Sequence, residues 1–306
     1  MGVKMMNRRY AFLILGILLI GITVFFIIDK PESTNEETPD NTQQEQQQDR
    51  PGGETKQEEE VDQEENQTSE KTAGEQIGQL REVFSEVVQT TIDFFSNRES
   101  NVTALGDSLT QGVGDNVTDG GYVGILDNTI NANNHLVTFD NYGKHGHRSD
   151  QLLKRLEEQQ VAQSVENADM VLITIGANDI MQVVKENFTD LKINDFTPAK
   201  ETYEENLRQI FDKIYSLNEN THIYLIGIYN PFMNYFPDIK ELDIIVEDWN
   251  NISRSVAAEH EDATFIPVAD LFSSGDKKLF ADDNFHPSHR GYQLFARRIL
   301  EHLTNQ

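Results

Sequence analysis

Hydrophobic and polar positions follow two different periods from about residue 76 to the end of the chain. Short, almost continuous apolar runs alternate with longer segments in which apolar residues recur every three or four positions. Short runs are typical of buried strands, and the longer spacing is typical of amphipathic helices. The pattern predicts strands at 102–105, 136–139, 170–175, 222–229 and 264–266.

The last of these strands should end at Pro267 or lie at the edge of a sheet, because proline cannot donate a hydrogen bond to a ladder. Helices are expected at 76–95, 121–130, 149–163, 201–217, 239–260 and 287–303. The longest predicted loops are 187–198 and 230–237. Strands that alternate with helices indicate an α/β protein, in which helices cover both faces of a parallel sheet.

The N-terminal part has a different pattern. An uncharged run from Tyr10 to Ile28 would span about 30 Å as a helix, the thickness of the hydrocarbon core of a bilayer. Basic residues precede the run and acidic residues follow it, so the positive-inside rule places the N-terminus in the cytoplasm. A cleaved signal peptide is the alternative, but its apolar core is usually shorter and ends at a small-residue cleavage site, which "IIDKPEST" lacks.

Composition adds a spacer to this picture. The formal net charge of the chain is −27, and residues 29–75 contribute roughly −12 of it with almost no apolar side chain. Such a segment cannot bury enough surface to fold, so we expect a disordered acidic spacer. The absence of a basic cluster argues against nucleic-acid binding. The chain has no cysteine, which excludes disulfides, thiolate metal sites and a cysteine nucleophile.

These patterns predict a single-pass protein of the cell membrane with its folded domain outside the cell. The expected parts are a cytoplasmic N-terminus (1–9), a transmembrane signal anchor (10–28), the disordered spacer (29–75), an amphipathic helix leading into the domain (76–100) and the domain itself (101–306).

Chemically reactive residue types follow the predicted strands. Because the carboxyl ends of parallel strands meet at one edge of a sheet, these residues should converge there although they are far apart in sequence. They are Ser108, Gly146, Asn178, Asp283 and His286.

Together these types suit the cleavage of an ester by a serine nucleophile. A serine hydroxyl needs a base to take its proton, and His286 is the candidate base. Asp283 would accept a hydrogen bond from the other imidazole nitrogen and so orient the ring. The N–H groups of Ser108 and Gly146 and the side-chain amide of Asn178 would donate to the oxyanion of the tetrahedral intermediate.

Four short segments carry a family resemblance. "GDSLTQG", "NYGKHG", "GAND" and "DNFHP" resemble the four blocks of the SGNH (GDSL-type) hydrolases, in the family's order. The resemblance covers 101 to about 302, and it looks closest to the lysophospholipase L1-related branch, in particular to membrane-anchored members from Bacillus-type bacteria. It implies a three-layer α/β/α sandwich of flavodoxin-like type with five parallel strands. It also implies the roles given above, without a cofactor or metal.

Several residues near these blocks admit more than one interpretation. His147 and Arg148 are candidate substrate contacts, since many family members carry small residues there. Phe232 and Tyr235 could line an acyl site or simply cover the sheet. Asp282 and His289 are the neighbours most easily confused with the acid and the base. The two histidines of "HGH" lack a nearby third ligand, so no metal site is predicted.

The leading hypothesis is a membrane-anchored, extracellular serine hydrolase that cleaves carboxylic esters, with lysophospholipase or esterase character. One alternative is a carbohydrate O-deacetylase acting on cell-wall polymers. Another is a non-catalytic module that binds glycan or lipid. Acyl transfer to a wall polymer usually needs a membrane-embedded donor module, which a single apolar run does not supply. The predicted partner is therefore an ester, either a lipid or an acylated glycan, together with the membrane.

Overall fold

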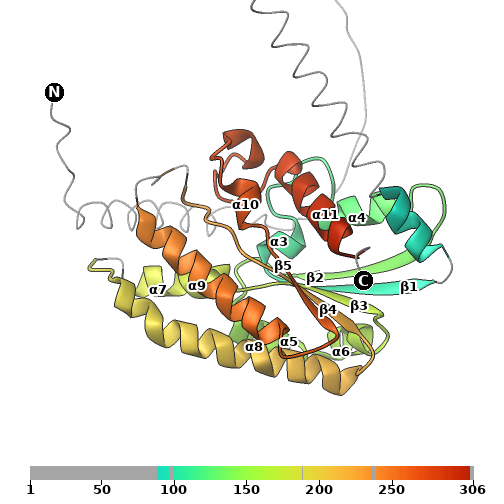
Figure 1. Cartoon of the computed structure of the whole chain (residues 1–306), viewed down its shortest axis with the longest axis horizontal. Coiled ribbons are helices and arrows are strands. Elements are labelled where there is room, and N and C mark those ends of the chain that lie inside the picture. The colour runs from blue at the N-terminus through green and yellow to red at the C-terminus, as the bar shows by residue number, and fades with distance from the viewer. Residues whose placement is uncertain (1–87, 97–98, 188, 234, 236–238, 304–306) are drawn as a thin grey trace, which may run out of the picture.

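The centre of the protein is a five-stranded, wholly parallel sheet (Figure 1). The structure is a computed structural model, and it describes residues 88–96, 99–187, 189–233, 235 and 239–303. The spatial order β2-β1-β3-β4-β5 is the doubly wound order of flavodoxin-like sheets. The strands are β1 (Ser100–Gly106), β2 (Val137–Gly143), β3 (Met170–Thr174), β4 (His222–Ile226) and β5 (Ala263–Ile266).

All five predicted strands are confirmed, with shifts at their ends. The second strand continues to Gly143, so all of "NYG" belongs to the sheet rather than to the following loop. The fourth strand stops at Ile226, three residues before its predicted end. The fifth is an edge strand that ends at Ile266, directly before Pro267, as the missing proline N–H requires.

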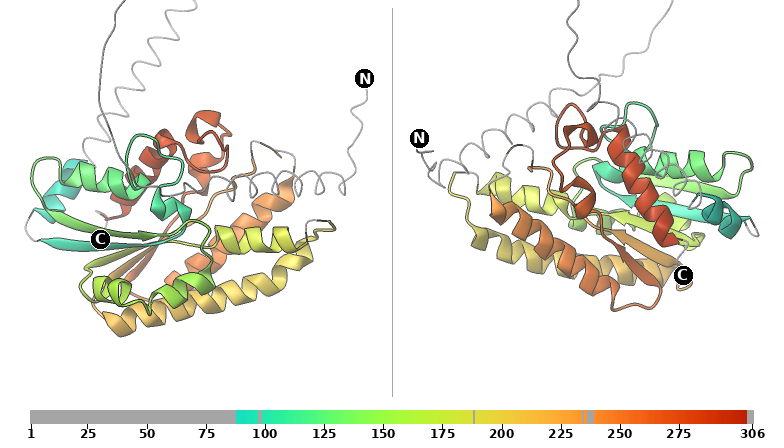
Figure 2. Two further views of the ribbon diagram at one scale, coloured as in Figure 1. Left: turned by 180° about the vertical axis from the view of Figure 1, so that it is seen from behind. Right: turned by 45° about the horizontal axis from the view of Figure 1, so that its top comes forward.

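Helices cover both faces of the sheet, which gives three layers (Figures 1 and 2). One face carries α5 (Ser149–Arg155), α6 (Gln159–Glu166), α7 (Ala177–Glu186), α8 (Thr197–Leu217) and α9 (Lys240–Ala257). The other carries α3 (Ser108–Gln111), α4 (Gly121–Ile130), α10 (Ala269–Phe272) and α11 (His289–Leu303). Two 3-10 turns, η1 (Ile193–Phe196) and η2 (Lys277–Leu279), lie in the connections.

Each strand contributes alternate side chains to two hydrophobic cores, one on either side of the sheet. In β3, Val171 and Ile173 pack with α5 to α9, whereas Met170 and Leu172 pack with α4 and α11. Both sides of the strand are buried, which explains why its sequence is almost uninterruptedly apolar.

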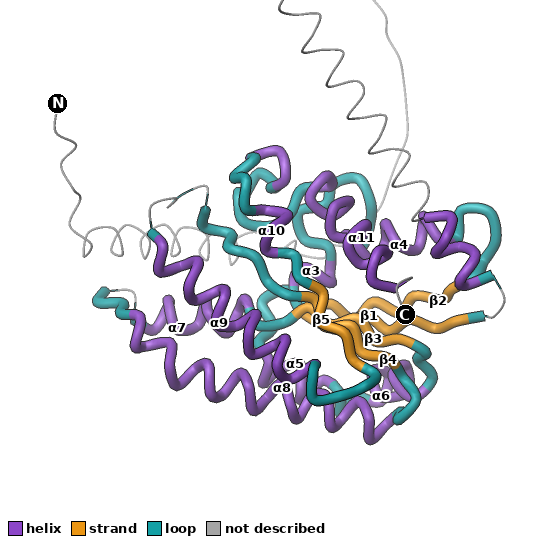
Figure 3. Tube along the Cα trace, viewed as in Figure 1, coloured by secondary structure: helices purple, strands orange, loops and turns teal. Residues whose placement is uncertain are grey.

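The helices differ from the prediction in several places. The single helix predicted at 149–163 is two helices, α5 and α6, separated by a turn at 156–158. Helix α7 was not predicted, because its polar beginning "AND" resembles a loop. The predicted loop at 187–198 also contains η1. Figure 3 distinguishes the strands of the central sheet from the helices that cover it and from the loops between them.

The N-terminal predictions fall mostly outside the described residues. Of the expected leading helix, residues 88–95 are described and are helical. The predicted anchor at 10–28 and the spacer at 29–75 are not among the described residues. Within the part of the chain that is described, no helix is long and apolar enough to cross a bilayer.

The strand ends are level with one another, and this register positions the candidate site. Gly106 at the end of β1 pairs with both Gly143 and Thr174, the last residues of β2 and β3. Thr174 pairs in turn with Ile226 at the end of β4. The loops that leave these four strands therefore begin at the same level along the strand direction, at one edge of the sheet.

Candidate active site

Ser108 lies in a tight turn between a strand and a helix. Strand β1 ends at Gly106, and Ser108 is already the first residue of the short helix α3. Asp107 caps this helix, because its carboxylate accepts a hydrogen bond from the backbone N–H of Leu109 at 3.0 Å. The Ser108 hydroxyl is thus fixed directly above the end of a central strand.

A buried polar network supports this turn from below. The Thr174 hydroxyl donates to the Asp107 carboxylate at 3.0 Å, and the hydroxyls of Thr174 and Thr110 lie 2.7 Å apart. Asp107 is only 1% exposed. Burial raises its pKa to about 6, although the hydrogen bonds from Leu109 and Thr174 oppose this rise. The sequence alone does not indicate that Thr174 contacts Asp107, because Thr174 is simply the last residue of an apolar strand.

The loop from Ala281 to His286 explains the three-residue spacing between the predicted acid and base. One oxygen of Asp283, Oδ1, accepts the backbone N–H groups of Phe285 and His286, each at 2.9 Å. Asn284 between them adopts a φ of 49°, a left-handed conformation that asparagine tolerates better than most residues. The second carboxylate oxygen of Asp283 is therefore left to face the imidazole.

Three side chains form a continuous chain of hydrogen bonds. His286 Nε2 lies 3.0 Å from Ser108 Oγ, and His286 Nδ1 lies 2.6 Å from Asp283 Oδ2. The imidazole is 2% exposed. Burial raises the pKa of Asp283, but the hydrogen bond from His286, the charge of that ring and the two backbone N–H donors outweigh it, so the pKa lies below its ordinary value. Asp283 is accordingly held as a carboxylate beside the ring.

Gly114 allows the loop that carries Ser108 and the loop that carries His286 to approach closely. Its φ is +96°, and a Cβ there would lie 2.6 Å from the carbonyl oxygen of Pro287 and 3.0 Å from the Cβ of His286. Any side chain at this position would push His286 away from Ser108. The close packing of these two loops therefore requires a glycine at position 114.

The predicted oxyanion donors come from two neighbouring loops that are tied together. Asn178, in the first turn of α7, donates its side-chain amide to the carbonyl oxygen of His147 at 2.9 Å. Gly146 has a φ of +77°, and a Cβ there would meet open space. Within the described residues, no hydrogen bond occupies the N–H of Ser108 or that of Gly146. These donors, together with the second amide hydrogen of Asn178, remain available to a ligand.

The four candidate substrate contacts have different environments. Arg148 pairs with Asp150, with Nε 3.0 Å from the carboxylate. His147 is partly buried, and its Nδ1 has no hydrogen-bond partner among the described residues. Phe232 is only 4% exposed and packs edge-on against Phe285, at 5.7 Å between ring centroids.

Tyr235 donates its hydroxyl to the backbone carbonyl of Asp283 at 3.3 Å. Tyr235 therefore lies beside the loop that carries Asp283.

The two residues that could be confused with Asp283 and His286 lie elsewhere. Asp282 is exposed. His289, at the start of α11, pairs through Nδ1 with Asp115 at 3.1 Å.

His145 is a neighbour that sequence reasoning missed. Its ring centroid lies 5.6 Å from that of His286, and its backbone N–H donates to the Gln111 side chain at 2.6 Å. Burial and then the charge of His286 lower the pKa of His145. The sequence did offer one indication of this proximity, because His145 directly precedes the candidate oxyanion donor Gly146.

No group of three or more potential metal ligands occurs in the described part of the chain.

Comparison with known proteins assigns the family. The profile of the GDSL-like lipase/acylhydrolase family matches residues 104–294. Over 210 residues, the chain is 35% identical to the uncharacterized protein YpmR of Bacillus subtilis, a match that covers 67% of this chain and 82% of YpmR. The chain belongs to the GDSL-like lipase/acylhydrolase family, a family of esterase- and lipase-type hydrolases. The resemblance seen in the four sequence blocks is thereby confirmed.

Two further relatives agree with this assignment. The spore germination lipase LipC of Bacillus licheniformis is 28% identical over 205 residues, which are 64% of this chain and 93% of LipC. Among solved structures, the lipase Lip_vut3 from a goat rumen metagenome superposes with a TM-score of 0.59 at 25% identity. That match covers 67% of this chain and 97% of the lipase.

The buried Asp107 predicts an unusual dependence of stability on pH. Because its pKa rises from 3.8 to about 6 on folding, the folded protein binds more protons than the unfolded chain between these values. Its contribution to stability therefore falls by about 3 kcal/mol as pH rises through this window. An Asp107→Asn variant, which keeps an oxygen acceptor, should lose that part of the pH dependence when urea unfolding is compared at pH 4 and pH 7.

Asp282→Asn is the matched control, since that side chain is exposed. It should show the same difference between the two pH values as the unmodified protein. An Asp107→Asn protein with an unchanged difference would contradict the prediction.

Proposed function

We propose that the protein hydrolyses carboxylic esters through a Ser108–His286–Asp283 triad and an acyl-enzyme intermediate. The observation that carries this proposal is the unbroken line of hydrogen bonds from the Ser108 hydroxyl through His286 to the Asp283 carboxylate. A serine in this setting can lose its proton as it attacks, which an ordinary surface serine cannot do. Family membership supports the same chemistry, as does the relative named a spore germination lipase.

Each step has a residue to perform it. Ser108 Oγ attacks the ester carbonyl while its proton passes to His286 Nε2. The oxyanion accepts hydrogen bonds from the N–H groups of Ser108 and Gly146 and from the Asn178 amide. Collapse breaks the C–O bond, and His286 returns the proton to the departing alcohol. Water then attacks the acyl-enzyme, again with His286 as base, and releases the acid and free Ser108.

The acyl group would be received by a narrow apolar crevice between α7 and α9. Its lining includes Ala177 and Phe285, which are the neighbours of Asn178 and His286 in sequence. Its volume of about 20 Å³ holds little more than one water-sized sphere. The side chains lining it are Ala177, Ile180, Met181, Ile228, Tyr229, Pro231, Phe232, Leu242, Ile245, Val246 and Phe285.

A crevice of this size favours short acyl groups. The lysophospholipase-like specificity that the sequence suggested needs a longer channel, and the buried side chain of Phe232 is part of the wall of this small crevice. We therefore place Phe232 at the end of the acyl site as the residue that limits chain length. Tyr235, through its bond to the Asp283 carbonyl, would steady the acid rather than bind substrate.

We further propose that Tyr10–Ile28 anchors the protein in the cell membrane with the hydrolase domain outside, and that the acidic segment 29–75 acts as an extended spacer. The support is the apolar length of the run and the distribution of charge around it. This placement would give the domain access to both lipids and wall polymers.

The direct kinetic test uses p-nitrophenyl esters from acetyl to palmitoyl with the full chain. We expect the highest kcat/KM for the shortest acyl groups and a loss of roughly a thousandfold or more in Ser108→Ala, since the nucleophile is removed. A maximum at long chains would instead support lysophospholipase-like specificity. Turnover that is equal in Ser108→Ala would refute the proposal. An absence of turnover on every ester would refute it as well and would favour a non-catalytic binding module.

The role of the acid has its own test. In Asp283→Asn the Oδ1 acceptor of the Phe285 and His286 N–H groups can remain, but an amide now faces His286 Nδ1 and stabilises the wrong tautomer. We expect kcat to fall by roughly a thousandfold or more. Asp282→Asn, one residue away and exposed, should keep kcat within about twofold. Equal activity of the two variants would contradict the assignment of Asp283.

A further inference from the structure

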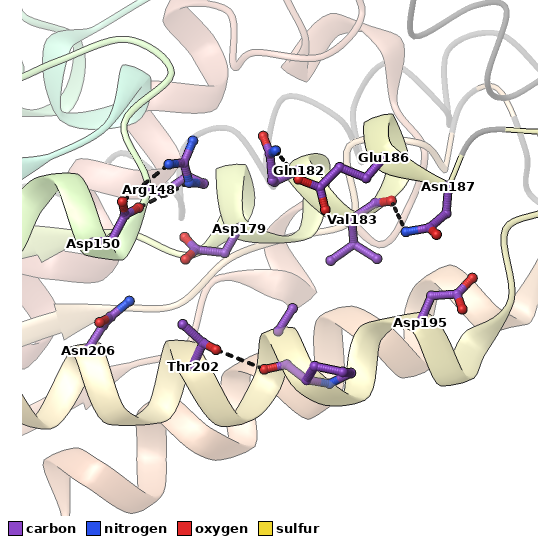
Figure 4. Close-up of a pocket in the computed structure, with 12 residues that line it drawn as sticks. Arg148, Asp150, Asp179, Gln182, Val183, Glu186, Asn187, Asp195, Thr202 and Asn206 are labelled. Carbon is purple, nitrogen blue, oxygen red and sulfur yellow. Dashed lines mark hydrogen bonds and ion pairs between the residues drawn. The ribbon is translucent and has the colours of Figure 1, made fainter.

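The polar groove between α7 and α8 that Figure 4 shows is separate from the proposed triad. None of the described residues that line it belongs to the triad. At one end of the groove, Arg148 already pairs with Asp150. The contacts that bear directly on the triad lie on the other face of the sheet, where α11 begins three residues after His286.

The start of α11 is hydrogen-bonded to the segment that follows α3. The Tyr292 hydroxyl donates to the carbonyl oxygen of Val113 at 2.8 Å. His289 Nδ1 lies 3.1 Å from Asp115 Oδ1. Gly114, between the two acceptors, packs against the turn that carries the candidate base. Three consecutive residues of this segment therefore contact the part of the chain that positions the candidate base.

The Asp115 carboxylate holds its own segment as well as α11. Its side chain is fully buried, and Oδ1 accepts the backbone N–H groups of Val117 at 2.8 Å and Thr118 at 3.0 Å. In the described part of the chain, His289 is the only side chain that pairs with this carboxylate. A buried carboxylate that lacks a donor is costly, so without His289 the segment would shift to bring Asp115 into contact with water.

The hydrogen bonds of His289 define which of its nitrogens carries the proton. Nε2 lies 3.0 Å from the side-chain nitrogen of Gln293, one turn further along α11. An amide nitrogen only donates, so Nε2 accepts, and the ring proton is on Nδ1, which donates it to Asp115. Both ring nitrogens are thus occupied. His289 is therefore not a second base for Ser108, and its role is a supporting one.

Both side chains of the Ser108–His286 pair are connected to this contact through short segments. The carbonyl oxygen of Ser108 accepts the N–H groups of Gly112 and Val113, each at 3.0 Å. On the other side, only two residues separate His286 from His289. A shift of either segment would change the 3.0 Å separation between Ser108 Oγ and His286 Nε2. A displacement of about 1 Å from the productive geometry can cost about a hundredfold in rate.

We propose that Asp115 and His289 are positioning residues for the hydrolysis, and that their hydrogen bond sets the distance between Ser108 and His286. The inference rests on the proposed function, since it concerns how the same triad is held. The pair acts through the backbone of the two segments rather than by contact with the substrate. Its loss should therefore lower kcat and leave KM almost unchanged.

The test measures kcat and KM of the full chain on p-nitrophenyl acetate. In His289→Ala the donor to Asp115 is lost, and we expect kcat to fall about tenfold while KM stays within about twofold. In His289→Asn the amide N–H can take the place of Nδ1–H, so kcat should recover to within about threefold of the unmodified protein.

His302→Ala is the matched control. His302 lies at the other end of α11, and its Nδ1 is also hydrogen-bonded, to the carbonyl oxygen of Arg298 at 2.8 Å. This variant loses the same kind of bond far from the segment that follows α3, so kcat should stay within about twofold. A kcat in His289→Ala equal to that of His302→Ala would overturn the inference.

A double-mutant cycle distinguishes a shared bond from two separate effects. Asp115→Ala alone should lower kcat at least as much as His289→Ala does. Adding His289→Ala to it should lower kcat by no more than about twofold further, because the bond is already absent. Losses that multiply would overturn the inference.

The test does not depend on Asp115→Ala being folded. The His289 side chain is 28% exposed, so its replacement leaves the core intact, and the comparison with His302→Ala then decides. An absence of Ser108-dependent turnover in the unmodified protein would instead remove the proposed function itself.

Discussion

The parallel register of four strands is the constraint on which the site depends. Gly106, Gly143, Thr174 and Ile226 lie side by side at the ends of β1 to β4, so the loops that follow them start from a common level. Side chains separated by almost two hundred positions can meet there only because this register is fixed by apolar packing on both faces of the sheet. The residues of the proposed active site are therefore carried by short loops on a rigid frame.

Hydrogen bonds then connect these loops to one another and to the sheet. Thr174 holds the Asp107 turn, the Asn178 amide holds the His147 carbonyl, and Ser149 holds Asp179. Two of these ties bury a carboxylate whose pKa is raised to about 6, which lowers stability at neutral pH relative to acid. The same hydrogen bonds hold the donors and acceptors of the proposed site in place before a substrate binds.

Much of this arrangement could be predicted from local sequence. Each strand is a compact apolar run, and the proposed acid and base, Asp283 and His286, are three residues apart because an Asx-type turn brings them together. Helix α7 was missed because its first turn resembles a loop, and the helix at 149–163 was not resolved into two. The burial of Phe232, the pairing of Arg148 with Asp150 and the approach of His145 to His286 depend on segments that meet only in the folded protein. Sequence periodicity carries no information about such contacts.

The central claim is that Ser108 is a nucleophile activated by its hydrogen bond to His286, and covalent labelling tests it most directly. The full chain would be treated with a fluorophosphonate at neutral pH, digested and analysed by mass spectrometry. The account predicts one phosphonylated serine, Ser108, and no labelling at this rate in an Asp283→Asn protein, whose imidazole is held in the wrong tautomer. Labelling spread over several serines, or an unlabelled Ser108 in a folded protein, would contradict it.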